Sequence, residues 1–172
     1  INVVGFSMGG WLAAEMATMD PSMFKKIVLV GATGVKPPVG EIYDMFLEIA
    51  QNFITAGFVD SSKVEEFQKI CPDDAPAELV EAWEVAREEA CRLGWKPYMY
   101  YAGLPQLLPR LKALPTLIVW GRQDAIVPIS AGELYHQSIP GSKLTVLEDC
   151  GHRPEIEKTS DFVQLVNEFL NS

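Results

Sequence analysis

Histidine and cysteine are scarce in this chain of 172 residues, and basic residues are outnumbered by acidic ones. Fourteen lysines and arginines against 23 aspartates and glutamates give a net charge of −9, which argues against nucleic acid or an anionic membrane as a partner. No apolar run reaches the roughly 20 residues that a helix needs to cross a bilayer. We therefore expect a protein that works neither on nucleic acid nor in a membrane.

The three cysteines, Cys71, Cys91 and Cys150, are scattered and lack the C-x-x-C spacing of metal sites and redox motifs. An odd, scattered set predicts reduced thiols in a cytoplasmic protein rather than a disulfide framework. The motifs of the chain imply neither a metal nor another cofactor. Cys150 lies two residues before a histidine, and we interpret it as a small buried residue of that loop rather than as a nucleophile.

The chain begins with an apolar run that ends in Gly5-Phe6-Ser7-Met8-Gly9-Gly10 and continues into an Ala-rich segment. A β-strand that breaks at Gly-x-Ser-x-Gly and enters a helix is typical of a nucleophile elbow, in which the serine hydroxyl projects from a strained turn. We expect Gly5 and Gly9 to make room for the strand and helix to pass closely, and Gly10 to add more room. Ser7 is therefore the candidate nucleophile.

The amide of Met8 would lie at the amino end of the helix that follows Ser7. Unpaired N–H groups and the helix dipole favour negative charge there. We predict that this backbone amide stabilises an oxyanion. A glycine-rich turn in an ordinary strand–helix unit would give the same pattern, so the motif needs catalytic partners.

A serine hydroxyl becomes a good nucleophile when a base removes its proton, and histidine is the usual base near neutral pH. Of the two histidines, His152 follows the apolar strand expected at 143–147, and open α/β sheets place their chemistry in loops of that kind. His136 lies in a polar stretch of an expected helix, where a surface histidine is more common. We predict that His152 is the base, the alternative being a structural histidine in that loop.

The acid that orients the base is predicted to be Asp124, in the loop after the strand at 116–120. Asp149 is the rival, but a residue so close to His152 in sequence usually lies in the same turn and caps backbone amides. The chain order is then Ser7, Asp124, His152, which is the order of α/β-hydrolases.

Three segments in this order resemble the α/β-hydrolase superfamily, specifically its bacterial esterase and carbon–carbon-bond hydrolase branch: Gly-Phe-Ser-Met-Gly-Gly, Trp-Gly-Arg-Gln-Asp-Ala-Ile-Val-Pro and Cys-Gly-His-Arg-Pro-Glu. The resemblance implies an α/β fold, a partial α/β-hydrolase fold with a parallel sheet flanked by helices and an all-helical cap inserted between two strands. We expect the core at 1–35 and 110–172, and the cap at 36–109. In the family the elbow strand is the fifth, so we expect on the order of 100 residues and the second oxyanion donor to lie upstream of this chain.

Within the expected cap, Ile42, Met45, Phe46 and Ile49 recur at helical spacing, and Ser62 with Glu65 forms the pattern of a capping box. A third helix is expected at 76–93. The cap would cover the serine and select the substrate. Its aromatic residues predict an apolar pocket for an acyl or alcohol group: Phe46, Phe53, Phe58, Phe67, Trp83, Trp95, Tyr98, Tyr100 and Tyr101.

The function predicted first is a serine hydrolase that cleaves a small, apolar carboxylic ester through an acyl-enzyme. The alternative is a carbon–carbon hydrolase of ring-cleavage diketo acids, which uses the same triad. That group often has a tryptophan directly after the histidine, where this chain has Arg153. A third hypothesis is a receptor that keeps the fold with little turnover.

Overall fold

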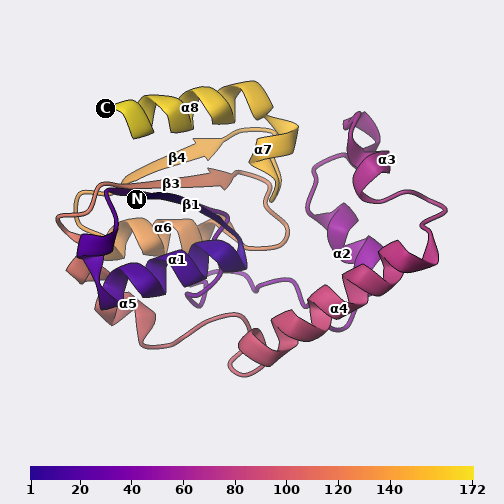
Figure 1. Ribbon diagram of the computed structural model, residues 1–172, viewed down its shortest axis with the longest axis horizontal. Coiled ribbons are helices and arrows are strands. Elements are labelled where there is room, and N and C mark those ends of the chain that lie inside the picture. The colour runs from indigo at the N-terminus through magenta and orange to yellow at the C-terminus, as the bar shows by residue number, and fades with distance from the viewer.

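One parallel sheet organises the computed structural model, which describes residues 1–172. Its strands lie in the order β1-β2-β3-β4, of which Figure 1 labels β1, β3 and β4: β1 (Asn2–Phe6), β2 (Lys26–Val30), β3 (Thr116–Gly121) and β4 (Lys143–Leu147). The register sets Val4 beside Val28 and Leu29 beside Ile118. Because all four strands are parallel, their carboxyl ends meet at one edge of the sheet.

Helices cover both faces of this sheet, and its central strands β2 and β3 are accordingly apolar after their first residues, Lys26 and Thr116. One face carries α1 (Met8–Met19), α6 (Ile129–Ser138) and the short α5 (Leu104–Leu107), and the other carries α8 (Thr159–Asn171). Five apolar residues recur at helical spacing along α8, and all of them pack in the cluster on that face: Phe162, Leu165, Val166, Phe169 and Leu170.

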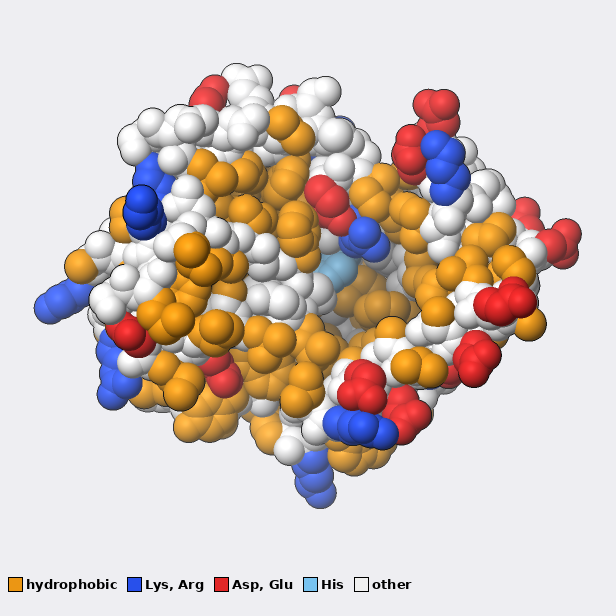
Figure 2. All heavy atoms as spheres, viewed as in Figure 1, with side chains coloured by type: hydrophobic (Ala, Val, Ile, Leu, Met, Phe, Trp, Pro, Cys, Tyr) orange, Lys and Arg blue, Asp and Glu red, His pale blue; other side chains and the backbone are white.

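The connection from β2 to β3 carries the helices that lie beside the carboxyl edge of the sheet in Figure 1. They are α2 (Ala50–Ala56), α3 (Phe67–Ile70) and α4 (Ala77–Gly94), and we call this part of the β2–β3 connection the helical insertion. The remaining short helices are η1 (Pro21–Met23), η2 (Ser61–Lys63), η3 (Leu108–Leu111) and α7 (Pro154–Glu157). Figure 2 shows a hollow between the body that contains the sheet and the part that contains α2, α3 and α4. Hydrophobic side chains line most of this hollow, and a histidine lies in it. No helix is both long enough and apolar enough to cross a membrane.

The helix predicted from the spacing of Ile42 to Ile49 is wrong, because this segment is irregular and α2 begins only at Ala50. Two of its backbone amides bind distant partners instead of forming helical bonds. The amide of Tyr43 donates to the carbonyl of Ile126 at 2.9 Å, and that of Met45 to the hydroxyl of Tyr98 at 2.9 Å. Burial raises the pKa of Tyr98 to about 12, so its hydroxyl keeps a proton, which it donates to the carbonyl of Tyr43 at 2.7 Å.

The helix predicted to start at Ser62 is also wrong in its extent. Only the three-residue η2 and the four-residue α3 form in this region. The residue that caps η2 is Asp60, whose carboxylate accepts hydrogen bonds from the amide and the hydroxyl of Ser62. The capping box of Ser62 and Glu65 therefore does not form.

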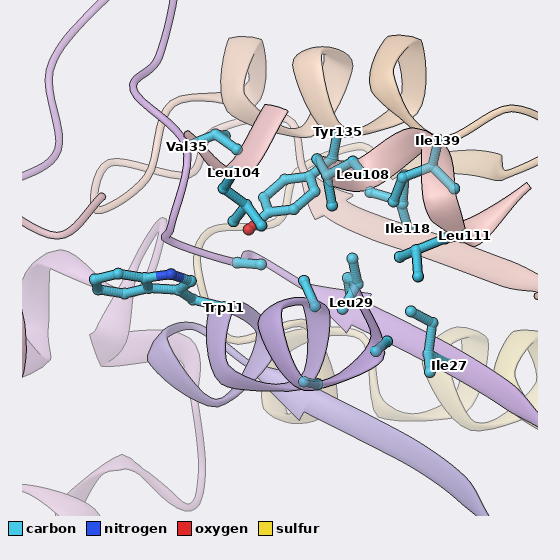
Figure 3. Close-up of a cluster of buried hydrophobic side chains, with 14 of the residues drawn as sticks. Trp11, Ile27, Leu29, Val35, Leu104, Leu108, Leu111, Ile118, Tyr135 and Ile139 are labelled. Atoms are coloured by element: carbon cyan, nitrogen blue, oxygen red, sulfur yellow. The ribbon is translucent and has the colours of Figure 1, made fainter. Parts of the chain in front are cut away.

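The main hydrophobic core lies between the sheet and the layer of α1, α5 and α6. Figure 3 shows side chains from the strands, from α1, from α5 with η3, and from α6 converging there. Leu104 and Leu108 are fully buried in this cluster. The segment around α5 therefore packs on the body of the sheet, while the boundaries at 36–109 given for the cap stay a prediction.

Candidate active site

Four loops meet at the carboxyl edge of the sheet, one after each strand. Ser7 follows β1, Gly31 follows β2, Asp124 lies in the loop after β3, and His152 in the loop after β4. This edge is where open α/β sheets bind their ligands. The sheet therefore brings the sequence-predicted residues from both ends of the chain to the same side.

Ser7 lies in a strained turn between β1 and α1. Its φ of 50° and ψ of −120° are rare for a residue with a side chain, and such conformations cost about 1–3 kcal/mol where they occur. The backbone holds it firmly, because its amide donates to the carbonyl of Val30 at 2.8 Å and its carbonyl accepts from the amide of Thr33 at 3.2 Å. This is the geometry expected of a nucleophile elbow.

The close passage of strand and helix depends on Gly5 and Gly10. A Cβ at Gly5 would lie 2.6 Å from the carbonyl oxygen of Gly9, and one at Gly10 would lie 2.7 Å from the Cβ of Ala32. A Cβ at Gly9 would meet nothing within 4 Å. The prediction that Gly9 makes room is therefore wrong, and Gly10 serves that purpose, because the face of α1 that packs on the sheet includes residue 10 and not residue 9.

Met8 is the first residue of α1, so its amide is one of those that a helix leaves without an intrahelical partner. Its side chain packs against the main core and also against the cluster of Met45, Ala90 and Met99 in the helical insertion. The insertion therefore lies directly against the elbow. The role of this amide in holding an oxyanion stays a prediction.

His152 and Asp124 form a buried pair. Nδ1 of His152 lies 2.8 Å from Oδ2 of Asp124, and the two side chains are 7% and 0% exposed. The other carboxylate oxygen, Oδ1, accepts the amides of Ile126 and Val127, each at 2.9 Å. Asp124 is thus fixed by its own loop, and it fixes the ring of His152 in turn.

Gly31 gives the ring of His152 its space. A Cβ at this position would lie 3.0 Å from Cε1 and Nδ1 of the ring and 3.3 Å from Oδ2 of Asp124. Its φ of +51° also favours glycine. Since the preceding residue, Val30, binds the amide of Ser7, the end of β2 lies between the elbow and the histidine pair. No hydrogen bond joins the Ser7 hydroxyl to His152 in this structure.

The rival residues lie in other surroundings. Asp149 is exposed in the turn after β4, with a φ of 49°. His136 is exposed on α6, where its Nδ1 lies 3.0 Å from the hydroxyl of Ser142. Cys150 is fully buried, and burial together with the charge of Glu157 raises the pKa of its thiol to about 12. A thiol of this kind stays protonated and is a poor nucleophile.

Sequence reasoning missed Gly31 and Glu157, both of which shape the loops of the site. Glu157 accepts the amide of Gly151, beside His152, at 2.7 Å. A glycine after a buried strand and an acidic residue five positions after the histidine were the available signals. Neither position stands out until the fold shows which backbone it approaches.

The helical insertion contains two cavities near the aromatic residues that the sequence singled out. One, of about 150 Å³, lies between α2 and α4, with Met45, Ala50, Phe53, Ile54, Trp83, Ala86 and Arg87 in its walls. The other, of about 260 Å³, has walls that include Tyr98 and Tyr100. Ser7 and His152 line neither, so the substrate pocket stays a prediction.

A family model described as "Alpha/beta hydrolase family" matches residues 1–165. The chain belongs to this family. The predicted resemblance and the predicted fold class are both confirmed. The chain spans less than two thirds of the length of the curated relatives that it matches over nearly all of its own residues.

One such relative is a 2-hydroxymuconate semialdehyde hydrolase from Pseudomonas putida, which is 29% identical over 181 residues, covering 98% of this chain and 62% of that protein. A 2-hydroxy-6-oxononadienedioate/2-hydroxy-6-oxononatrienedioate hydrolase from Klebsiella pneumoniae is 47% identical over 68 residues, covering 38% of this chain and 24% of that protein. Among solved structures, 2-hydroxy-6-oxo-6-phenylhexa-2,4-dienoate hydrolase from Rhodococcus sp. strain RHA1 superposes with a TM-score of 0.74 at 22% identity, covering 99% of this chain and 63% of that chain. The similarity to this solved structure shows a shared fold.

Proposed function

We propose that this hydrolase uses Ser7 as nucleophile, His152 as base and Asp124 as the acid that orients the base. The observation that carries the proposal is the buried 2.8 Å contact between His152 and Asp124, at the sheet edge where Ser7 occupies its strained turn. A carboxylate on Nδ1 fixes the imidazole tautomer whose Nε2 accepts a proton. Asp124 suits this role because two backbone amides hold its other oxygen.

In the proposed reaction, His152 removes the proton of Ser7 as the hydroxyl oxygen attacks a carbonyl carbon. The amide of Met8 donates to the oxygen that becomes negative. The bond from the carbonyl carbon to the leaving group then breaks, with its electron pair going to the leaving group, and the imidazolium of His152 supplies the proton. Water, activated by the same histidine, releases the acid from Ser7.

For the substrate, we propose a ring-cleavage diketo acid cut at a carbon–carbon bond, with a carboxylic ester as the second candidate. The sequence alone favoured the ester. Two relatives that match nearly the whole chain at 29% identity are named as 2-hydroxymuconate semialdehyde hydrolases, which supports placing the diketo acid before the ester. A carbon leaving group needs its negative charge delocalised, and a second carbonyl conjugated to it, as in a vinylogous diketo acid, provides that.

The test compares both substrate classes on the full-length protein, with Ser7→Ala as the matched inactive variant. We expect turnover of a 2-hydroxy-6-oxo-2,4-dienoate, measured as the loss of its visible absorbance. Its kcat/KM should be at least tenfold above that for 4-nitrophenyl acetate. Ester turnover that exceeds dienoate turnover would favour the second candidate. Turnover of either substrate that persists in Ser7→Ala would refute the proposed mechanism, and so would the absence of turnover in the wild type. Binding of a substrate without turnover would favour a receptor.

A further inference from the structure

The loop that carries His152 is joined to the helical insertion by one direct hydrogen bond and by two more that meet on the carboxylate of Glu157. The amide of His152 donates to the carbonyl of Gly57 at 2.8 Å. Glu157, on α7, accepts the amide of Gly151 at Oε2, at 2.7 Å, and the amide of Val59 at Oε1, at 2.8 Å. One carboxylate thus bridges two segments that lie about 90 residues apart in the sequence. We call Gly57–Val59, Gly151–His152 and Glu157 the cap joint.

The two segments of the cap joint approach so closely that residue 151 must be glycine. A Cβ there would lie 2.7 Å from the carbonyl oxygen of Gly57 and 3.2 Å from the Cα of Phe58. It would also lie 2.9 Å from Oε2 of Glu157. The backbones are therefore in direct contact, and any movement of one segment displaces the other.

Apolar packing reinforces the joint on the side of α7. Ile156, the neighbour of Glu157, packs against a cluster of the insertion that is centred on Phe58, Phe67 and Cys71. Phe58 is itself part of the joint and is buried. The short α7 therefore holds the insertion with an apolar side chain and a charged one at once.

We propose that Glu157 is a positioning residue that couples the helical insertion to the catalytic histidine. Its side chain has no hydrogen bond to Ser7 or Asp124, and it acts through the amide of Gly151, the residue that precedes His152. Because the carboxylate accepts amides from both segments, the position of the insertion determines where the imidazole lies relative to Ser7. This inference rests on the proposed function for its catalytic consequence, but the coupling itself is a property of the structure.

The effect of Glu157 should be visible without any substrate. Glu157→Gln keeps the size of the side chain, but its NH₂ group cannot accept an amide, so one of the two bonds is lost. We expect faster hydrogen exchange at whichever of the Gly151 and Val59 amides loses its acceptor, and also at His152, whose own acceptor, Gly57, is unchanged. Loss of protection at His152 is the signature of coupling, since a merely local role would leave that amide protected.

The catalytic arm measures kcat and KM for the substrate that Ser7-dependent turnover identifies. A misplacement of about 1 Å can cost on the order of a hundredfold in rate, so we expect Glu157→Gln to lower kcat tenfold or more with KM changed less than threefold. The matched control is Glu148→Gln, which makes the same charge change at an exposed residue paired with Arg122. It should leave kcat and the three amides unchanged.

A second variant separates loss of coupling from loss of the fold. Glu157→Asp keeps the charge, but it is one methylene too short to hold both amides, and it should reproduce the exchange pattern of Glu157→Gln while amides of β2 and β3 stay protected. Unchanged exchange at His152 in a folded variant would overturn the coupling. Faster exchange with an unaltered kcat would overturn the positioning role and leave the proposed function intact. Absence of Ser7-dependent turnover in the wild type would refute the proposed function and, with it, the catalytic role of Glu157, while the exchange arm would still decide the coupling.

Discussion

His152 and His136 carry the same side chain in opposite surroundings. His152 is buried against Asp124, whereas His136 is exposed and contacts Ser142. We predict that His152→Ala lowers kcat by several orders of magnitude, because loss of a triad member removes the whole unit, and that His136→Ala stays within threefold of the wild type. Steady-state kinetics of both variants measure this. An inactive His136→Ala beside an active His152→Ala would overturn the assignment.

At the scale of residues, the sequence was most informative where side-chain chemistry and chain order coincide. Ser7, Asp124 and His152 are predicted from their types and from the strands before them, and the structure brings the last two into contact. Gly31 was not identified, because its role depends on the ring of a residue 121 positions away. Glu157 was missed for the same reason, since it acts by binding backbone amides, which no sequence pattern displays.

Among the elements, α8 offers the sharpest test of the packing. Phe162 is 7% exposed, and its ring lies 5.7 Å from that of Phe6, whereas the next residue, Val163, is 49% exposed. We predict that Phe162→Ala lowers the free energy of unfolding by about 3–5 kcal/mol, through lost burial and the cavity left behind. Val163→Ala is the control and should change it by less than about 0.5 kcal/mol. Urea unfolding followed by circular dichroism measures both, and equal losses would show that α8 does not pack on the sheet as described.

The predicted elements agree with the structure where a single local signal dominates. The strand predicted at 143–147 agrees in full, because a short segment rich in apolar and β-branched residues between turn residues has few alternatives. The segment at 42–49 did not form its predicted helix, because its apolar residues face partners in the body and in the insertion rather than one helical face. The hydroxyl of Tyr98 and the carbonyl of Ile126 take the amides that a helix would have used. Competition of this kind depends on tertiary contacts.

The molecule as a whole exposes apolar surface along β1 and α1. β1 has one neighbour in the sheet, and on the outer side of α1 Leu12, Met16 and Met19 are exposed. An unprotected edge strand with apolar surroundings is a template for association. We predict that the 172-residue chain, studied alone, self-associates in a concentration-dependent way.

Light scattering coupled to size exclusion measures that association. Met16→Glu combined with Met19→Lys should lower the apparent mass at a given concentration, because charged groups on α1 disfavour contact between copies. Val85→Glu, at an exposed apolar position of α4, is the control and should not change it. A wild-type chain that stays monomeric across the concentration range would contradict the prediction.

The central claim is that Ser7 is a nucleophile activated by His152 and Asp124. Its most direct test is labelling of the protein with a phosphonate ester, which transfers its phosphorus to an activated serine, followed by peptide mass spectrometry. The account predicts one label, on Ser7, formed at least a hundredfold more slowly in His152→Ala and in Asp124→Ala. A label on another residue, or equal labelling of Ser7 in the wild type and in His152→Ala, would contradict it.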